Sequence, residues 1–241
     1  MMRKHIPNTL TILNLAFGFT AILYLVTGHV NIAVFLVLIA AVFDFLDGFA
    51  ARMLKAYSEL GKQLDSLSDM VSFGVVPSLI LFHEIMLATG GRFPASFPGI
   101  IFLFTPVLVV AGAGLRLARF NTGASGSRIF EGLPTPAMAL FMISLPLVRE
   151  TGYFHGYVSW LQHPSVLAVL ALLFGWLMIS RLPMFSLKFK NYHFRENVLT
   201  YIFLAVSLAL LILFSFRALF LIVILYIFMA LGAAIVSGKT S

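Results

Sequence analysis

The sequence predicts an all-α integral membrane protein, and three observations support this fold class. Of its 241 residues, 61% are hydrophobic and 10% are charged, which leaves too little polar surface to cover a water-soluble globule. Apolar stretches of about 20 residues, the length that crosses a bilayer as a helix, recur along the chain. The connections between them are short. We therefore expect residues 1–241 to form a single membrane-embedded domain.

Eight apolar stretches are candidate transmembrane helices. The shortest is expected to begin at Pro134 and Pro136 and to be kinked at Pro146, because proline starts helices well but interrupts them internally. The first stretch is long enough to span, and no small-residue cleavage site stands out, so we expect it to be retained. The full set is 7–27, 30–53, 64–88, 98–119, 134–149, 164–181, 197–214 and 217–236.

The basic residues predict how these helices are oriented. If the N-terminus is cytoplasmic, all 16 lysines and arginines except Arg92, Arg149 and Arg217 fall on the cytoplasmic side, as the positive-inside rule requires. Both termini are then cytoplasmic, and the protein is multi-pass in an inner or plasma membrane. The net charge of +7 is better explained by this topology and by anionic lipid headgroups than by nucleic acid, which we do not expect as a partner.

Four aspartates are the strongest candidates for chemistry. Asp44 and Asp47 lie three positions apart near the end of stretch 30–53, and Asp65 and Asp69 lie four apart near the start of stretch 64–88. Each spacing puts a pair on one helix face, and a short connection makes the two helices antiparallel neighbours. Four converging carboxylates cannot all stay ionised without a cation. Mg²⁺ or Mn²⁺ suits an all-oxygen site, and Ca²⁺ fits by ligand type alone.

Small and basic residues lie close to the aspartates in the sequence. Gly48, Ala51 and Gly61 carry little or no side chain, so a phosphorylated ligand can approach the backbone beside them. Arg52 supplies a permanent cation for phosphate oxygens. The alternative is that the small residues serve ordinary helix packing, as they do in many membrane proteins.

Asp44-Phe-Leu-Asp47-Gly48-Phe-Ala-Ala51-Arg52, followed after eight residues by Gly61-Lys-Gln-Leu-Asp65-Ser-Leu-Ser-Asp69, resembles the full signature of the CDP-alcohol phosphotransferases. The resemblance implies a six-helix core around a cytoplasm-facing polar cavity, a homodimer, and two metal ions. It implies that the metal ligands are Asp44, Asp47, Asp65 and Asp69, with Asp69 also the base that activates the acceptor hydroxyl. It assigns CDP binding to Asn8, Thr11, Asp47, Gly48, Ala51, Arg52 and Gly61.

Three further segments resemble the membrane-embedded phosphatidylserine synthases of that family: residues 6–14, 116–121 and 132–137, with Met138 a departure where a small residue is expected. This resemblance implies CDP-diacylglycerol and L-serine as substrates. Serine carries a carboxylate, and Arg116 or Arg119 can supply the cation that it needs. The alternative is that both arginines only set topology by reaching the membrane surface.

Two other functions remain open. A sister enzyme would use glycerol 3-phosphate or inositol phosphate as acceptor, since an acceptor phosphate also needs arginines. A cation transporter or channel would use the intramembrane aspartates as an ion path, but it does not explain the spacing of Gly48, Arg52 and Gly61 to the acids. None of the six histidines is followed two positions later by lysine, which favours direct transfer over a phosphohistidine intermediate.

Overall fold

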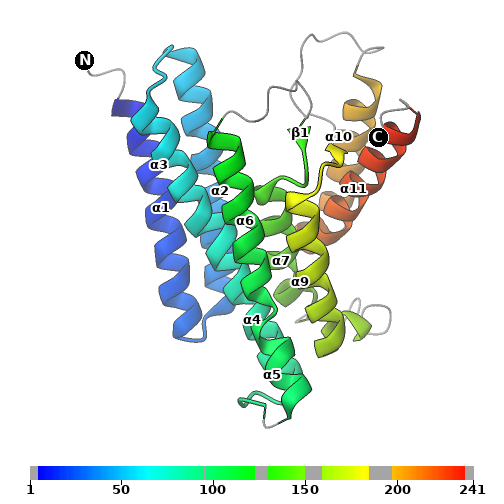
Figure 1. The fold of residues 1–241 in the computed structure, drawn as a ribbon. Coiled ribbons are helices and arrows are strands. Elements are labelled where there is room, and N and C mark those ends of the chain that lie inside the picture. The colour runs from blue at the N-terminus through cyan, green and yellow to red at the C-terminus, as the bar shows by residue number, and fades with distance from the viewer. Residues whose placement is uncertain (1–4, 95, 123–129, 150–158, 185–196, 237–241) are drawn as a thin grey trace.

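The computed structural model describes residues 5–94, 96–122, 130–149, 159–184 and 197–236, and these are mostly helical (Figure 1). Helices lie within every stretch that the sequence predicted to be helical. In chain order they are α1 (His5–Val26), α2 (Val30–Met53), α3 (Glu59–Asp69), the π-helix η2 (Met70–Val75), α4 (Val76–Ala88), α5 (Phe97–Phe104), α6 (Pro106–Asn121), α7 (Thr135–Arg149), the 3-10 turn η4 (Ser159–Gln162), α9 (Pro164–Ile179), α10 (Val198–Phe214), the 3-10 turn η6 (Ser215–Ala218) and α11 (Leu219–Val236).

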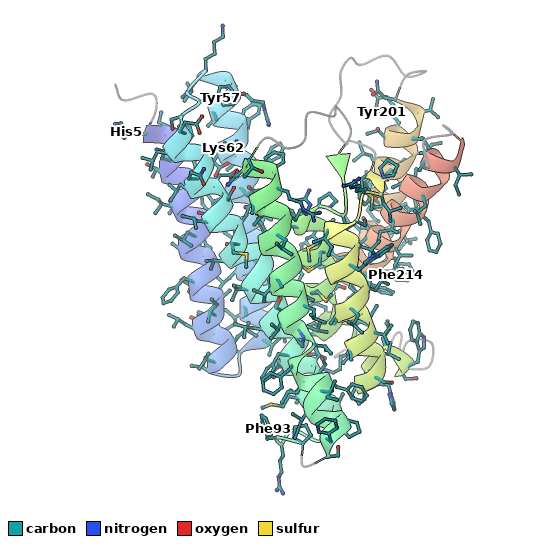
Figure 2. All side chains as sticks on the ribbon, viewed as in Figure 1. His5, Tyr57, Lys62, Phe93, Tyr201 and Phe214 are labelled. Atoms are coloured by element: carbon teal, nitrogen blue, oxygen red, sulfur yellow. The ribbon has the colours of Figure 1, made fainter. Side chains whose placement is uncertain are left out.

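Five helical segments of the described chain are long and apolar enough to cross a membrane. α7 and α9 are shorter apolar helices. Large apolar side chains point outward from the bundle (Figure 2), and Phe19, Trp176 and Ile212 are 56%, 56% and 75% exposed. Such a surface suits lipid rather than water. The chain is therefore a multi-pass helical membrane protein, with candidate spans at His5–Val26, Val30–Met53, Glu59–Ala88, Phe97–Asn121 and Val198–Ile235.

Two of the differences from the helices predicted from hydropathy have a clear local cause. α3 begins at Glu59 rather than at residue 64, because the Ser58 side chain caps the helix by accepting a 3.0 Å hydrogen bond from the Gly61 amide. The stretch 98–119 is divided into α5 and α6 at Thr105, since Pro106 has no amide hydrogen to continue the helical ladder. α7 begins at Thr135 and contains Pro146, as expected.

The helices form one elongated bundle. α1, α2 and α3 lie side by side at one edge, α10 and α11 lie at the other, and α6, α7 and α9 lie between them (Figure 1). α6 and α9 approach closely, because a Cβ at Gly112 would lie 2.8 Å from the backbone oxygen of Gly175. His5, Tyr57 and Lys62 lie at one end of the bundle, and Phe93 lies at the opposite end (Figure 2).

A short antiparallel strand pair, which the sequence did not predict, joins the segments that follow α6 and α9. β1 (Phe130–Glu131) pairs with β2 (Pro183–Met184). The ladder continues where the Gly132 amide donates to the Leu182 oxygen at 2.9 Å. Gly132 has a φ of 73°, a conformation that glycine adopts without strain. This link fixes the start of α7 relative to the end of α9.

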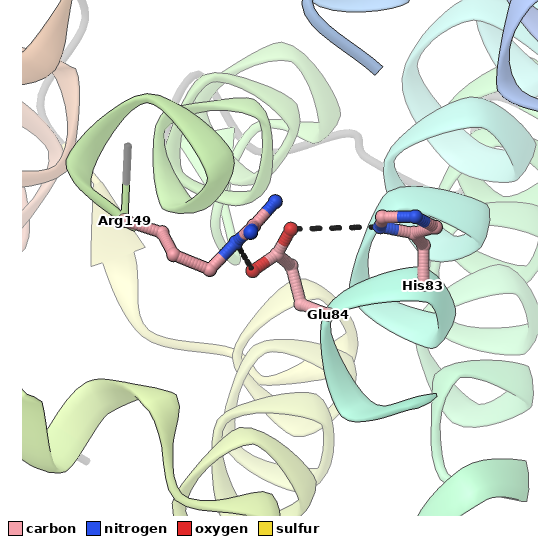
Figure 3. Close-up of polar contacts among 3 residues, drawn as sticks. All are labelled: His83, Glu84 and Arg149. Atoms are coloured by element: carbon pink, nitrogen blue, oxygen red, sulfur yellow. Dashed lines mark hydrogen bonds and ion pairs between the residues drawn. The ribbon is translucent and has the colours of Figure 1, made fainter. Parts of the chain in front are cut away.

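A buried ion pair joins α4 to α7 (Figure 3). Glu84 on α4 is 4% exposed, and its Oε2 lies 3.0 Å from Nε of Arg149, the last residue of α7. The neighbouring His83 places Nδ1 3.6 Å from the other carboxylate oxygen. Removing one partner of such a pair leaves a charge without its counter-ion. The pair is therefore expected to hold the two helices together.

Candidate active site

Three of the four predicted aspartates converge from two helices. Asp44 and Asp47 on α2 and Asp65 on α3 place carboxylate oxygens within 4.8 Å of one another. Asp47 is only 5% exposed, and its Oδ2 is buried with no hydrogen-bond partner among the described residues. The short connection at residues 54–58 makes α2 and α3 antiparallel neighbours, and the spacing of each pair puts its acids on one helix face.

Asp69 lies one turn beyond Asp65 and belongs to the same cluster. Its carboxyl group is within hydrogen-bonding reach of the Asp44 carboxyl. From α1, Nδ2 of Asn14 donates a 3.3 Å hydrogen bond to Asp69 Oδ1. The structure therefore brings all four predicted acids together, and it adds a neutral donor that orients one of them.

The cluster fits a divalent cation by its chemistry. All of its donor atoms are carboxylate oxygens, which hard cations such as Mg²⁺ and Mn²⁺ prefer. Within the described ranges the ion pairs are those of Glu84, so no lysine or arginine forms an ion pair with these aspartates there. A buried carboxylate oxygen without a partner, such as Asp47 Oδ2, is costly unless a cation or a proton satisfies it.

Hydrogen bonds from α3 and η2 hold α1 against the acidic face. Ser68 Oγ donates to the Thr11 backbone oxygen, and Ser72 Oγ donates to the Asn14 backbone oxygen, each at 3.1 Å. Gly18 packs directly on the Ser72 side chain. Asn14, Ser68 and Ser72 were not among the predicted site residues. A possible signal was the recurrence of Thr11, Asn14 and Gly18 at helical spacing along one face of an apolar helix.

The two predicted glycines of the CDP site have different surroundings. A Cβ at Gly48 would meet only Nη1 of Arg52, at 3.8 Å, so protein atoms leave the space beside it open. A Cβ at Gly61 would lie 2.9 Å from Oδ1 of Asn8 and 3.0 Å from Oγ of Ser58. Gly48 thus leaves room for a ligand, whereas Gly61 leaves room for α1.

The other residues predicted to bind CDP lie around this cluster. The Thr11 side chain is buried and within hydrogen-bonding reach of Asp47. Ala51 is half-buried on α2, and Arg52 is exposed at the end of the same helix. These positions line the end of α2 and the facing side of α1, next to the aspartates.

The two arginines predicted to bind the acceptor differ in their contacts. Arg116 on α6 donates from Nη1 to Thr135 Oγ1 at 3.1 Å, and its charge interacts with Asp69. Arg119 is exposed and donates from Nη1 to the Ile179 backbone oxygen at 2.9 Å. Met138, the departure from the expected pattern, is fully buried in the hydrophobic core. Of the two arginines, Arg116 is the one linked to the aspartates.

A second set of hydrogen bonds fixes α6 against α3. Asn121 accepts from Ser66 Oγ at 3.0 Å through its side chain and from Lys62 Nζ at 2.8 Å through its backbone oxygen. The Asn121 amide in turn donates to Gln63 Oε1 at 3.3 Å. These bonds fix α6 along α3, and with it the position of Arg116.

Sequence comparison identifies this architecture. Residues 4–179 match the model of the CDP-alcohol phosphatidyltransferase family. An archaetidylserine synthase of Methanothermobacter thermautotrophicus is 36% identical over 151 residues, which cover 62% of this chain and 59% of that protein. The chain spans about three fifths of the length of several curated relatives that it matches.

Two other relatives are aligned over more of their length. A CDP-diacylglycerol–serine O-phosphatidyltransferase of Methanocaldococcus jannaschii is 33% identical over 205 residues, covering 85% of this chain and 82% of that protein. One of Bacillus subtilis is 31% identical over 197 residues, covering 81% of this chain and 96% of that protein. The family match covers all four clustered aspartates and both arginines. The chain therefore belongs to the CDP-alcohol phosphatidyltransferase family.

Proposed function

We propose that this protein transfers the phosphatidyl group of CDP-diacylglycerol to the hydroxyl of L-serine, giving phosphatidylserine and CMP. The observation that carries the proposal is the convergence of Asp44, Asp47 and Asp65 within 4.8 Å, with Asp69 beside them. The names of the relatives support the serine acceptor, since they include archaetidylserine synthase and CDP-diacylglycerol–serine O-phosphatidyltransferase.

The aspartates are proposed to hold two divalent metal ions, Mg²⁺ or Mn²⁺, as the resemblance to the family implies. When bound, such ions neutralise the diphosphate and the departing CMP. Asp44, Asp47 and Asp65 provide the ligand oxygens, and Asp69 touches the same site. This assignment explains why four acids face one another without an ion pair to lysine or arginine among the described residues.

Asp69 is proposed to be the base. It accepts the proton of the serine hydroxyl while the serine oxygen bonds to the phosphorus on the lipid side of the diphosphate. The bond from that phosphorus to the bridging oxygen breaks, and CMP leaves with the bridging oxygen. Asn14 holds Asp69 Oδ1 through its amide, which leaves the other carboxylate oxygen to accept the serine proton.

CDP binding is proposed for the end of α2 and the facing side of α1. The open space beside Gly48 admits the diphosphate, and Arg52 adds a cation one turn away. Ala51 limits the bulk next to it. Asn8 and Thr11 complete this wall from α1, and Gly61 allows Asn8 to approach.

Arg116 is proposed to bind the serine carboxylate. Its Nη1 is engaged by Thr135, while its Nε is buried without a hydrogen-bond partner among the described residues. A charge-assisted bond to a carboxylate would satisfy that donor. Arg119 is the weaker candidate, because it is exposed and already bonds the end of α9.

The finer architecture is also a proposal. We infer a single domain with eight membrane spans, a six-helix core around a cytoplasm-facing cavity, both termini cytoplasmic, and a homodimer. The connection after α2 and the strand pair lie at one end of the bundle, opposite the α4–α5 connection (Figure 1). Tags at either terminus should resist reagents added outside intact cells, whereas a probe beside Arg92 should react.

The direct test is CMP release by the purified protein. With CDP-diacylglycerol and Mg²⁺, serine should release CMP, and glycerol 3-phosphate and inositol phosphate should not. The ether-linked isoprenoid analogue of the donor is tested in the same panel. Release with a phosphorylated alcohol alone would replace serine by that acceptor. Cation flux through proteoliposomes without CMP release would instead support the channel or transporter.

A further inference from the structure

The C-terminal helix α11 brings a buried tyrosine near the proposed acceptor site. Tyr226 is only 6% exposed, and its ring meets that of Phe203 on α10 edge-on, with centroids 5.8 Å apart. α11 also packs along α7 and against β2, which fixes it relative to the start of α7. Tyr226 lies outside residues 4–179, the segment matched by the family. It is therefore a feature that the family match does not explain.

Arg116 links this tyrosine to the aspartates. It donates a 3.1 Å hydrogen bond to Thr135, which is fully buried at the first position of α7, and it lies near enough to Tyr226 and Asp69 for its charge to act on both. Its Nε is a buried donor with no partner among the described residues. A buried donor of this kind costs free energy until an acceptor reaches it. The Nε donor of Arg116 can therefore bond one anionic group of a ligand.

Arg116 has two neutral hydroxyl residues near it, and Asp69, whose charge also acts on it, forms no ion pair with it. Thr135 and Tyr226 are both neutral hydroxyl residues, and none of the ion pairs in the described ranges involves Arg116. An acidic residue at position 135 or 226 would form an ion pair with Arg116 and so weaken its attraction for an incoming carboxylate. A tyrosine hydroxyl can in addition donate a hydrogen bond to a carboxylate.

We propose that Tyr226 and Thr135 are positioning residues that hold the Arg116 guanidinium for the carboxylate of an amino acid acceptor, so that α11 helps to determine acceptor specificity. This inference rests on the proposed function, because it requires an acceptor with a carboxylate. A single arginine that bonds one neutral hydroxyl and lies near another matches one negative charge. A phosphomonoester carries more charge and would call for further cations.

The test compares Tyr226→Phe and Thr135→Val in the full-length protein. Each removes one hydroxyl and keeps most of the side-chain shape. Each should raise the KM for serine by about 3- to 10-fold, the effect of one lost hydrogen bond, with kcat and the KM for CDP-diacylglycerol within about twofold of the parent. Thr135→Ser keeps the hydroxyl and should behave like the parent. Tyr24→Phe, at a half-exposed tyrosine of α1, is the matched control.

Serine methyl ester distinguishes a positioning role from a merely structural one. A structural defect would affect serine and its ester equally. The ester keeps the nucleophilic hydroxyl but lacks the negative charge, so the parent should prefer serine to the ester. In Tyr226→Phe and Thr135→Val this preference, measured as the ratio of kcat/KM values, should shrink. An unchanged KM and an unchanged preference in both variants would overturn the inference, and so would an equal loss for both acceptors.

Failure of the proposed function has a different signature, because it appears in the parent enzyme. If the parent releases no CMP with serine, the acceptor assignment is wrong whatever the variants do. If the parent uses serine and the variants match it, only the role of Tyr226 and Thr135 is wrong. A Tyr226→Phe protein that does not fold leaves the decision to Thr135→Val, whose substitution lies on a different helix.

Discussion

Oδ1 of Asn8 lies 2.9 Å from the point that a Cβ at Gly61 would occupy. Real Cβ atoms do not come so close to an oxygen, so the two residues depend on each other. Asn8 is on α1 and Gly61 is on the first turn of α3, and both belong to the segments proposed to bind CDP. The absence of a side chain at Gly61 therefore determines how near α1 comes to the acidic helix.

Gly61→Ala should displace Asn8 and raise the KM for CDP-diacylglycerol by about 10-fold, because the new methyl group pushes a proposed contact away from the donor. The KM is measured from initial rates of CMP release. Gly232→Ala is the control, since a Cβ there meets nothing within 4 Å. If steric conflict is the cause, Asn8→Ala and Gly61→Ala combined should be no worse than Asn8→Ala alone. Fully additive losses would refute this explanation.

Asp65→Asn keeps the shape of a cluster residue but removes its charge. We expect kcat to fall by at least about two orders of magnitude, the scale of one essential electrostatic group. The Mg²⁺ concentration that gives half-maximal rate should also rise, because one ligand is weakened. Glu59→Gln, at an exposed acid on the same helix, should change neither quantity. Parent-like metal dependence in Asp65→Asn would remove Asp65 from the metal site.

Chelation of divalent metals should abolish turnover, because a diphosphate approaching four carboxylates is otherwise repelled. Activity should return when Mg²⁺ or Mn²⁺ is added in excess. The measurement is CMP release before and after metal is restored to one chelated sample. Full activity in excess chelator would contradict the proposed mechanism.

Asn14→Leu should lower kcat by about 10- to 100-fold, because it removes a hydrogen bond to the proposed base worth roughly 1.5–3 kcal/mol. The KM for CDP-diacylglycerol should change little, since Asn14 is bonded to Asp69. Thr9→Val is a suitable control on the same helix, because among the described residues the exposed Thr9 hydroxyl donates only to the His5 backbone oxygen. Equal kcat values for parent and Asn14→Leu would show that Asp69 needs no orientation from α1.

Arg116→Ala should raise the KM for serine by roughly 10- to 1000-fold, as expected for loss of a charge-assisted bond in a dry site. Arg119→Ala should leave the KM for serine near that of the parent, because this side chain bonds the end of α9. Arg116→Lys should rescue only partly, since an ammonium lacks the planar two-point grip of a guanidinium. The opposite pattern in serine kinetics would transfer the role to Arg119.

Glu84→Gln should lower the thermal unfolding temperature in detergent by several degrees. The substitution leaves Arg149 without its counter-ion, although water or headgroups can reach the arginine, which is 32% exposed. We expect a cost of about 1–3 kcal/mol, with kcat close to that of the parent. An unfolding temperature equal to the parent's would mean that the ion pair contributes nothing to stability.

Hydropathy and residue spacing predicted the helices and the acidic cluster well. Asp44, Asp47, Asp65 and Asp69 could be brought together from sequence because helical periodicity is local and residues 54–58 leave little choice but an antiparallel pair. The start of α3 was missed because its first turn is polar, and hydropathy does not detect a serine cap. The break at Thr105 was missed because the apolar stretch continues through Pro106.

Contacts between distant segments could not be predicted in the same way. The bond from Asn14 to Asp69 depends on the vertical register of α1 against α3, and the bond from Arg116 to Thr135 depends on where α7 begins. Neither the position of α1 along α3 nor the start of α7 produces a periodic pattern in the sequence. The pairing of β1 with β2 involves two residues on each strand, too few to show an alternating pattern.

The π-helix η2 separates the acid-bearing helix α3 from α4, and its wide turn is shown by the Val76 amide, which donates to the Val71 oxygen five residues back. Such a turn holds about one residue more than an α-helical turn. Deleting one residue within Met70–Val75 should therefore tighten it to an α-helix and keep the faces of α3 and α4 in phase. The segment from Val76 to His83 contains no wide turn, so a deletion of one residue there cannot be absorbed. That change would rotate Glu84 by about 100° around the axis of α4, away from Arg149. Tolerance to length changes should thus be confined to a few positions of this long helical segment.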